Sequence, residues 1–249
     1  MICALLVFQT PELPALLPRL SPWVDWLGVP IEELVQGLEQ QQHRRFVKTH
    51  TPLDGLPMRD EATYLVVARH PLEAAVSLYH QGDNLDRVKM HELTGAPLPT
   101  GPRPELHEWL TDWISAEADP VQELDSLPGV AWHMADAWTR RDDPNVLLVH
   151  YADLAADLEG QMRAIARRLS FDVDETGWSA LVNAASFNSM RSRADVIAPA
   201  TGVLKSSAAF FRRGATGEVR ELLTADEVNT YDERIAALLP RDVAEWLNR

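Results

Sequence analysis

Two nearly continuous apolar runs most constrain how this chain can fold. "TYLVVAR" (63–69) and "NVLLVHY" (145–151) have the composition of strands that are covered on both faces of a parallel sheet. A shorter run, "FVKTH" (46–50), predicts a third strand. Amphipathic helical patterns occur at 71–81, 130–141, 157–171 and 224–239. Strands that alternate with helices predict an α/β fold with a central parallel sheet.

The amino-acid composition limits the kinds of partner that the protein can bind. The 249 residues carry a formal net charge of −14, which argues against a nucleic acid or an anionic membrane surface as partner. The single cysteine, Cys3, excludes an internal disulfide and fits a reducing cytoplasm. The apolar start, residues 1–10, has no basic leader and is too short to span a bilayer, so we expect a core helix there and no integral membrane segment.

No composition shift or repeat marks a domain boundary, so the sequence predicts one domain over 1–249. Two stretches rich in turn-forming residues, 95–108 and 191–219, read as long loops. Loops of this length in a compact domain tend to be lids or binding segments.

Basic side chains gather where the predicted strands end. Lys48 and His50 are two residues apart, so their side chains point the same way if the segment is extended. Arg69 ends the second strand, directly before a helix that carries Ser77. Ligands of open parallel sheets bind beyond the carboxyl ends of the strands, and a helix N-terminus with an arginine beside it suits a phosphate. A late Arg-Arg-Gly triplet, 212–214, adds a second basic cluster.

Each feature alone is more often structural. A Lys-x-His triplet arises by chance in many proteins, and by itself it favours a structural interpretation over a functional one. A strand-end arginine commonly caps a surface or pairs with a carboxylate, and an Arg-Arg-Gly turn is commonly solvated. Their order along the chain is what favours a functional interpretation.

That order resembles the sulfotransferases that use 3′-phosphoadenosine 5′-phosphosulfate (PAPS) as donor. The segments similar to motifs of that family are "KTH" (48–50), "YLVVARHPLEAAVSLYH" (64–80), "WHMADAWTRRDDPNVLLVHYADL" (132–154), "SFNSM" (186–190) and "FFRRGATGEVRELLT" (210–224). The resemblance therefore runs over most of the chain, and the motifs are jointly specific.

The resemblance implies a role for each matching residue. It makes His50 the general base for the acceptor hydroxyl and Lys48 the cation that neutralises charge on the transferred group or leaving phosphate. For the nucleotide, the implied contacts are Arg69, Ser77, Arg212, Arg213 and Gly214 to the 3′-phosphate, and Tyr151 and Phe187 to the adenosine. It implies PAPS as co-substrate and requires no metal, since positive side chains carry the electrostatic work.

The resemblance also implies a fold: a three-layer sandwich with a central parallel sheet and the mononucleotide-binding topology of P-loop proteins. Two positions depart from the family. Glu218-Val219 replaces the usual Asp-Trp, and residue 1 corresponds to a point inside the helix that follows the family's phosphosulfate loop. We therefore expect the first strand and that loop to be absent from the chain as given, and the reading frame to extend upstream.

Two other functions stay open at this level. A chain without the phosphosulfate loop could bind the nucleotide weakly or act only as an interaction protein. A small-molecule kinase on the related fold is disfavoured because no G-x-x-x-x-G-K-[ST] motif occurs. The acceptor would contact the loops around 80–106 and 195–210, whose apolar, proline-rich character favours a small or lipid-like hydroxyl compound (a lipid, phenol or glycolipid alcohol). The sequence carries no signal for the oligomeric state.

Overall fold

The computed structural model describes residues 1–214 and 218–249. The chain divides into two compact units, each assembled from three separate stretches. The first unit comprises Met1–His50, Asp83–Thr100 and Asp157–Gly214. The second unit comprises Thr51–Gly82, Gly101–Ala156 and Ala215–Arg249. The single domain over 1–249 stays a prediction.

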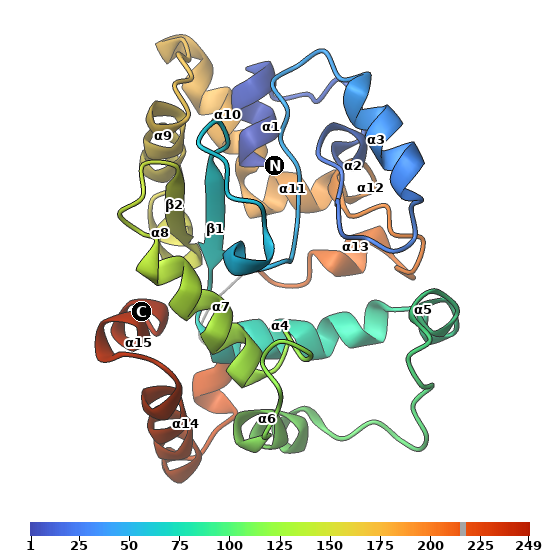
Figure 1. Cartoon of the computed structure of the whole chain (residues 1–249), viewed down its shortest axis with the longest axis vertical. Coiled ribbons are helices and arrows are strands. Elements are labelled where there is room, and N and C mark those ends of the chain that lie inside the picture. Colours follow the sequence, from blue (N-terminus) through green and yellow to red (C-terminus); the bar gives the residue numbers. More distant parts are fainter. Residues whose placement is uncertain (215–217) are drawn as a thin grey trace. The chain divides into compact units, whose positions relative to one another are not determined.

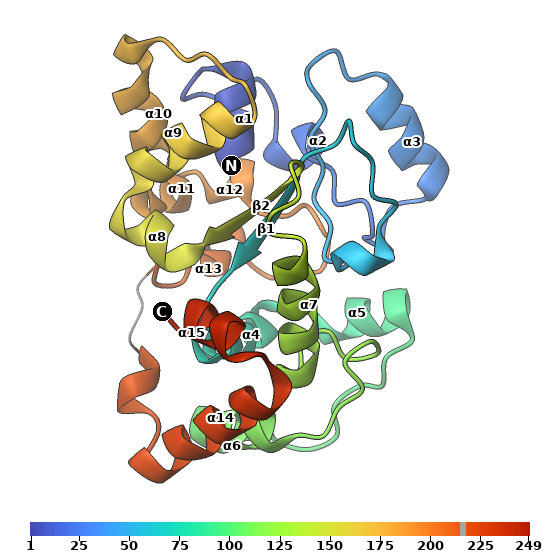
Figure 2. The ribbon, with the colours of Figure 1, turned by 60° about the vertical axis from the view of Figure 1, so that its left-hand side comes forward.

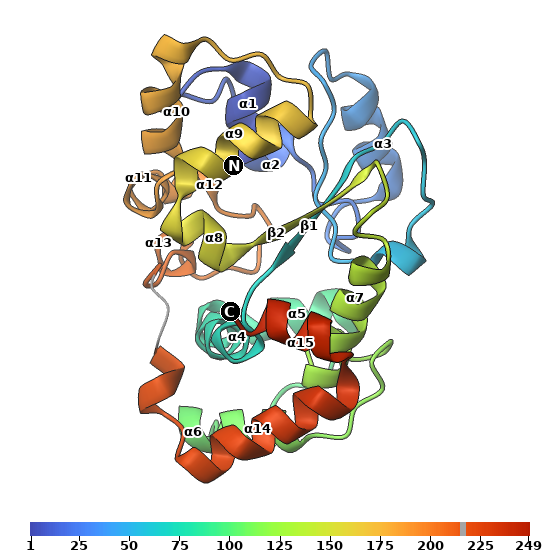
Figure 3. The same cartoon turned by 90° about the vertical axis from the view of Figure 1, so that its left-hand side faces the viewer.

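The second unit contains a two-stranded parallel sheet. Strand β1 (Tyr64–Ala68) pairs with β2 (Val146–His150), in a register that sets Ala68 opposite His150. Figures 1 and 3 show the two strands side by side. Both strands were predicted, but β1 is not covered on both faces as expected, because Val67 is 61% exposed. The parallel sheet is thus confirmed at a smaller size, and the three-layer, mononucleotide-binding topology stays a prediction.

The third predicted strand, 46–50, is wrong. This stretch makes one isolated parallel bridge, between Lys48 and Trp23. The reason is local: Pro22 accepts a hydrogen bond from Lys48 but has no N–H with which to continue a ladder, and Pro52 follows two residues after the segment. An apolar segment forms a strand only when it pairs with another strand, and the neighbour of residues 46–50 is a loop.

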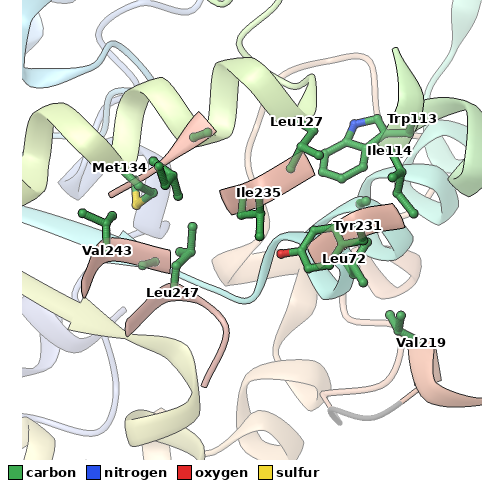
Figure 4. Packing of buried hydrophobic residues seen from close by; sticks show 14 of the residues in the cluster. Leu72, Trp113, Ile114, Leu127, Met134, Val219, Tyr231, Ile235, Val243 and Leu247 are labelled. Atoms are coloured by element: carbon green, nitrogen blue, oxygen red, sulfur yellow. The ribbon is translucent and has the colours of Figure 1, made fainter. Parts of the chain in front are cut away.

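Helices supply most of the second unit. They are η1 (Leu53–Gly55), α4 (Pro71–Asn84, whose last two residues belong to the first unit), α6 (Leu106–Ser115), α7 (Leu127–Thr139), α8 (Tyr151–Ala156), η3 (Glu218–Glu221), α14 (Ala225–Leu238) and α15 (Arg241–Leu247). Tyr231 and Ile235 of α14 and Leu247 of α15 are at most 2% exposed. Figure 4 shows them in one apolar cluster with Leu72 of α4 and Met134 of α7. The core of this unit therefore joins its first stretch to its last.

The first unit is helical in its described part. Its helices are α1 (Ile2–Phe8), α2 (Leu17–Leu20), α3 (Ile31–Glu39), α5 (Arg87–Thr94), α9 (Leu158–Arg168), η2 (Glu175–Gly177), α10 (Trp178–Ala185), α11 (Phe187–Ser192), α12 (Ala194–Ile197) and α13 (Ser207–Phe210). The expected core helix at the start is confirmed, since Ala4, Leu5 and Leu6 of α1 are fully buried. Helix α1 packs against α10, and α10 against α9 (Figure 3).

Capping side chains set several helix boundaries. Thr224 and Glu227 form the predicted capping box at the start of α14, with Thr224 N–H donating to Glu227 Oε2 at 2.8 Å. The long loop expected over 191–219 is interrupted by the short helices α12 and α13, and Ser206 caps α13 by accepting from Ala209 N–H. A single serine in the right place is enough to start a turn of helix inside a loop. No helix of the described residues is both long and apolar enough to cross a membrane.

Candidate functional site

Lys48 and His50 lie beside a tryptophan-rich loop of the first unit. The backbone of Lys48 donates to Pro22 O at 2.8 Å, and its carbonyl accepts from Val24 N–H at 2.9 Å. These two bonds fix the segment 46–50 against residues 22–24. They bring Trp23 directly beside Lys48.

The indole of Trp23 contacts both predicted catalytic residues. Lys48 Nζ lies 4.0 Å from the centroid of the Trp23 ring. The His50 ring centroid lies 4.5 Å from the Trp23 centroid, with the planes at 50°. Both side chains therefore contact the same aromatic ring, and their convergence on one ligand stays a prediction. Trp26 stacks on Trp23 at 4.9 Å and extends that surface.

Asp25 ties down the backbone between the two residues. Its Oδ2 atom accepts from the His50 backbone N–H at 2.9 Å and from Thr49 Oγ1 at 3.0 Å. Hydrogen bonds to a charged acceptor are about twice as strong as those between neutral groups. One carboxylate thus holds the end of the segment that carries Lys48 and His50.

The pKa of Lys48 is shifted from its usual value. Its partial burial lowers its pKa from the usual value, because burial disfavours the charged form, and the nearby Asp25 carboxylate opposes that shift. The ammonium group is also attracted to the face of the Trp23 ring. Lys48 is therefore a partly desolvated cation, which interacts more strongly with an anion than a fully hydrated one does.

Arg69 and Tyr151, which we call the strand-end group, follow the two paired strands of the second unit. Because Ala68 and His150 are opposite each other in the register, the next residues are neighbours as well. The Arg69 guanidinium lies over the Tyr151 ring, 4.8 Å from its centroid, and pairs with Glu73 Oε2 at 3.3 Å. Among the described residues, the buried Arg69 Nε has no hydrogen-bond partner. An orphaned guanidinium N–H suits an anionic ligand.

Ser77 is exposed on α4, four residues after Glu73. Residues four apart on a helix share a face, so Ser77 lies on the face that carries the Arg69–Glu73 pair. Its hydroxyl is accessible to a ligand, and its predicted contact with a phosphate stays a prediction.

Phe187, Arg212, Arg213 and Gly214, which we call the late-loop group, belong to the first unit. Gly214 has a φ of 65°, and a Cβ atom on it would lie 2.3 Å from Phe187 Cγ. Only glycine fits that conformation and that contact without displacement. Arg212 is half-buried and Arg213 exposed. Residues 215–217 of the matching motif lie outside the described part.

The two loops expected to contact the acceptor are joined to each other. Asn84 Nδ2 donates to Ser206 O at 2.9 Å, and Ser206 N–H returns a bond to Asn84 Oδ1 at 3.0 Å. An isolated antiparallel bridge between Leu85 and Leu204 continues this contact. Residues far apart in the sequence, near 84 and near 205, are thus held side by side within the first unit.

Sequence reasoning missed four residues that define these surroundings: Trp23, Asp25, Trp26 and Glu73. The available signal was "PWVDW" (22–26), where two aromatic rings flank an acid in a short loop. Its pairing with residues 48–50 spans about two dozen positions, so no local pattern reveals it. Glu73 follows Arg69 at i+4, a spacing that favours an ion pair.

The described residues contain no group of three or more His, Cys, Asp or Glu side chains able to hold a metal ion. The expectation that no metal is required stays a prediction.

Comparison with known proteins gives consistent results. Residues 2–244 match the family described as the sulfotransferase domain. The chain is 39% identical to a glycolipid sulfotransferase of Mycobacterium bovis over 267 residues, which cover 98% of this chain and 82% of that protein. A glycolipid sulfotransferase of Mycobacterium tuberculosis is 38% identical over 266 residues with the same coverage. Rat sulfotransferase 1 family member D1 is 24% identical over 225 residues, covering 86% and 68%.

Solved structures share the fold at lower identity. A mouse sulfotransferase complexed with PAP superposes with a TM-score of 0.67 at 18% identity, covering 88% of this chain and 73% of that one. Retinol dehydratase in complex with androsterone and inactive cofactor PAP gives a TM-score of 0.68 at 20% identity, covering 91% and 71%. The family match over nearly the whole chain and the two mycobacterial relatives agree: this protein belongs to the sulfotransferase domain family, a family of enzymes.

Proposed function

We propose that the protein transfers a sulfuryl group from PAPS to a hydroxyl group of a glycolipid. The observation that supports the chemistry is the contact of both Lys48 and His50, a cation and a base, with the Trp23 ring. The acceptor class rests on the mycobacterial relatives, which are glycolipid sulfotransferases 38–39% identical over 98% of this chain.

His50 is the proposed general base. It takes the proton from the acceptor hydroxyl as the acceptor oxygen forms its bond to sulfur and the bond from sulfur to the phosphate oxygen breaks. Histidine suits this role because its unperturbed pKa of about 6.5 lies near operating pH. Lys48 neutralises the charge that develops on the departing phosphate, where a partly desolvated cation is most effective.

The nucleotide contacts are proposals of the same kind. We assign Arg69, Ser77, Arg212, Arg213 and Gly214 to the 3′-phosphate and Tyr151 and Phe187 to the adenosine. The buried, unpartnered Arg69 Nε supports an anionic ligand, as far as the described residues show its surroundings. The close contact of Gly214 with Phe187 supports a requirement for glycine beside the aromatic ring.

The experiment is an assay with PAPS and a panel of acceptors: a neutral glycolipid, a simple phenol, a sterol and a charged polysaccharide. We expect a sulfated glycolipid by mass spectrometry, together with stoichiometric release of the desulfated nucleotide. Parallel reactions contain ATP in place of PAPS. Phosphorylated product with ATP and none with PAPS would identify a kinase instead. Weak or no binding of the desulfated nucleotide by calorimetry, with no product from any acceptor, would identify a non-catalytic member of the fold.

A further inference from the structure

Helix α3 presents an apolar face that the described structure leaves open. Ile31, Leu34, Val35 and Leu38 recur at the spacing of one helical face, yet no residue of α3 is fully buried. Ile31 is 59% exposed and Val35 44%. In Figures 1 and 2, α3 lies at the outer edge of the first unit. An amphipathic helix normally turns such a face toward a core, and no core covers this face in the described structure.

The exposed apolar residues continue on both sides of the helix. Leu27 is 69% exposed and Val29 38%, before α3, and Val47 is 45% exposed after it. We call Leu27, Val29, Ile31, Val35 and Val47 the apolar segment. Scattered exposed aliphatic residues are ordinary, but a run of them around one unburied helix marks an interaction surface.

The apolar segment continues directly from the proposed catalytic residues. Trp26, one residue before Leu27, stacks on Trp23, whose ring contacts Lys48 and His50. At the C-terminal end of the apolar segment, Val47 directly precedes Lys48, which forms the bridge to Trp23. The stretch that contains the apolar helix therefore begins and ends with residues that contact the Trp23 ring: Trp26 before it and Lys48 after it.

Charge restricts what can cover this surface. The remaining face of α3 carries Glu32, Glu33 and Glu39, all exposed, and the chain as a whole has a net charge of −14. Helices that bind anionic membranes carry lysine and arginine on the polar face. Glutamates in those positions disfavour an anionic lipid surface and permit an uncharged one.

We propose that the apolar segment rests on the surface of an uncharged glycolipid assembly, so that an acceptor headgroup moves from that surface to His50 without crossing water. The inference deepens the proposed function and rests on it, because a glycolipid acceptor is presented by its own aggregate. An interfacial helix with its axis in the plane of the headgroups buries the face that α3 leaves exposed. Helix α3, with nine residues, is about 13 Å long, enough to lie across a few headgroups.

Sedimentation with vesicles tests the surface without any need for catalysis. The probe is phosphatidylcholine vesicles that carry monogalactosyl diacylglycerol, compared with vesicles of phosphatidylglycerol. The test protein has Ile31→Ser and Val35→Ser together. The matched control has Val121→Ser and Leu124→Ser, which change two residues of similar exposure, 56% and 38%, outside any proposed site. Thermal unfolding checks that all three proteins are folded.

We expect the wild-type protein and the control to bind the neutral vesicles. The α3 variant should bind at least about tenfold more weakly, since two aliphatic side chains that contact the vesicle surface are replaced by serine. Equal binding by all three proteins, no binding by the wild type, or preference for the anionic vesicles would overturn the proposal.

A second assay separates this inference from the proposed function. With PAPS, a short-chain alkyl glycoside dissolved as monomers should be sulfated equally by the wild type and the α3 variant, while the vesicle-borne glycolipid is sulfated at least about tenfold more slowly by the variant. If the wild type sulfates the soluble glycoside but the variant keeps full activity on vesicles, the docking surface is refuted and the function stands. If nothing is sulfated yet vesicle binding is lost in the variant, the surface stands and the function fails.

Discussion

Arg69 and Tyr151 stand at the ends of two paired strands, whereas Lys48 and His50 lie in a segment with a single bridge. The ladder of β1 and β2 positions the first pair through the backbone, so their neighbourhood follows from register alone. The second pair has two backbone hydrogen bonds, both made by Lys48, and otherwise depends on side chains: a tryptophan ring and one aspartate. The contrast teaches that Arg69 and Tyr151 are positioned by the strand pairing itself, while the proposed catalytic residues are held by a few replaceable contacts.

The largest expected effect separates chemistry from binding. Replacing His50 by alanine removes the proposed base, so turnover should fall by roughly 10²–10⁴-fold, the range for general base catalysis. Affinity for the desulfated nucleotide, measured by calorimetry, should stay unchanged. His133→Ala is the matched control, because His133 lies on α7 and belongs to none of the proposed contacts. Near-normal turnover with saturating acceptor would show that another group accepts the proton.

Asp25 tests whether the catalytic segment really depends on side chains. Asp25→Ala removes the acceptor for the His50 N–H and the Thr49 hydroxyl, and turnover should drop by about 10²-fold, the cost of a displacement near 1 Å. Asp25→Asn keeps an oxygen acceptor and should lose less. In Asp25→Asn the pKa of Lys48 should decline further, since the opposing carboxylate charge is gone. The alkaline fall of kcat should then begin at lower pH; an unshifted profile would contradict the link between Asp25 and Lys48.

Replacing Arg69 tests the role proposed for the residues that follow the paired strands. Arg69→Ala should weaken binding of the desulfated nucleotide by roughly 1.5–3 kcal/mol, the scale of a hydrogen bond to a charged group, and do little to an analogue without the 3′-phosphate. Arg140→Ala is the control, because Arg140 forms a similar i,i+4 pair with Asp136 on α7. Equal losses for the two ligands would mean that Arg69 acts through the fold, for example through its ion pair with the buried Glu73.

The smallest effect concerns pH and the strand ends. His150, beside Tyr151, is 1% exposed; its Nε2 lies 3.2 Å from Leu247 O, and its Nδ1 accepts from Ala152 N–H. Burial lowers its pKa, against the opposing effect of the Leu247 carbonyl, so the folded state holds it neutral. The stabilisation from neutral His150 is complete above the unfolded pKa of about 6.5 and is lost as pH falls below it, because only the unfolded state gains the proton readily.

Denaturant unfolding at pH 7.5 and 5.5 measures this loss. His150→Asn keeps an acceptor for Ala152 N–H but does not titrate, so its stability should change less between the two pH values than that of the wild type. The half-buried His133, whose pKa is also lowered by desolvation, supplies a remaining change of the same sign. The stability of His91→Asn should change between the two pH values as that of the wild type does. If the stability of His150→Asn changes by the same amount as well, His150 does not cause the loss.

The contrast also explains what the sequence could reveal. Local sequence patterns were enough to predict the strands β1 and β2 and the helices α4, α7, α9 and α14. The capping box of Thr224 and Glu227 is likewise local, because it spans only four residues. The false strand at 46–50 has the same local pattern, but its partner is a loop with a proline, which no local pattern shows. The surroundings of the proposed catalytic pair escaped for the same reason: Trp23 and Asp25 reach Lys48 and His50 only through the tertiary fold.

The hydrogen bond between His150 and Leu247 has a consequence for protein synthesis. It joins the end of β2 to a helix made 97 residues later. At a translation rate of about 5–20 residues per second, β2 waits roughly 5–20 seconds before α15 exists to cover it. During that interval the strand and its histidine are open to chaperones and proteases. Slowing the ribosome over the last hundred codons should therefore lengthen the vulnerable period of the second unit, although the finished protein would be identical.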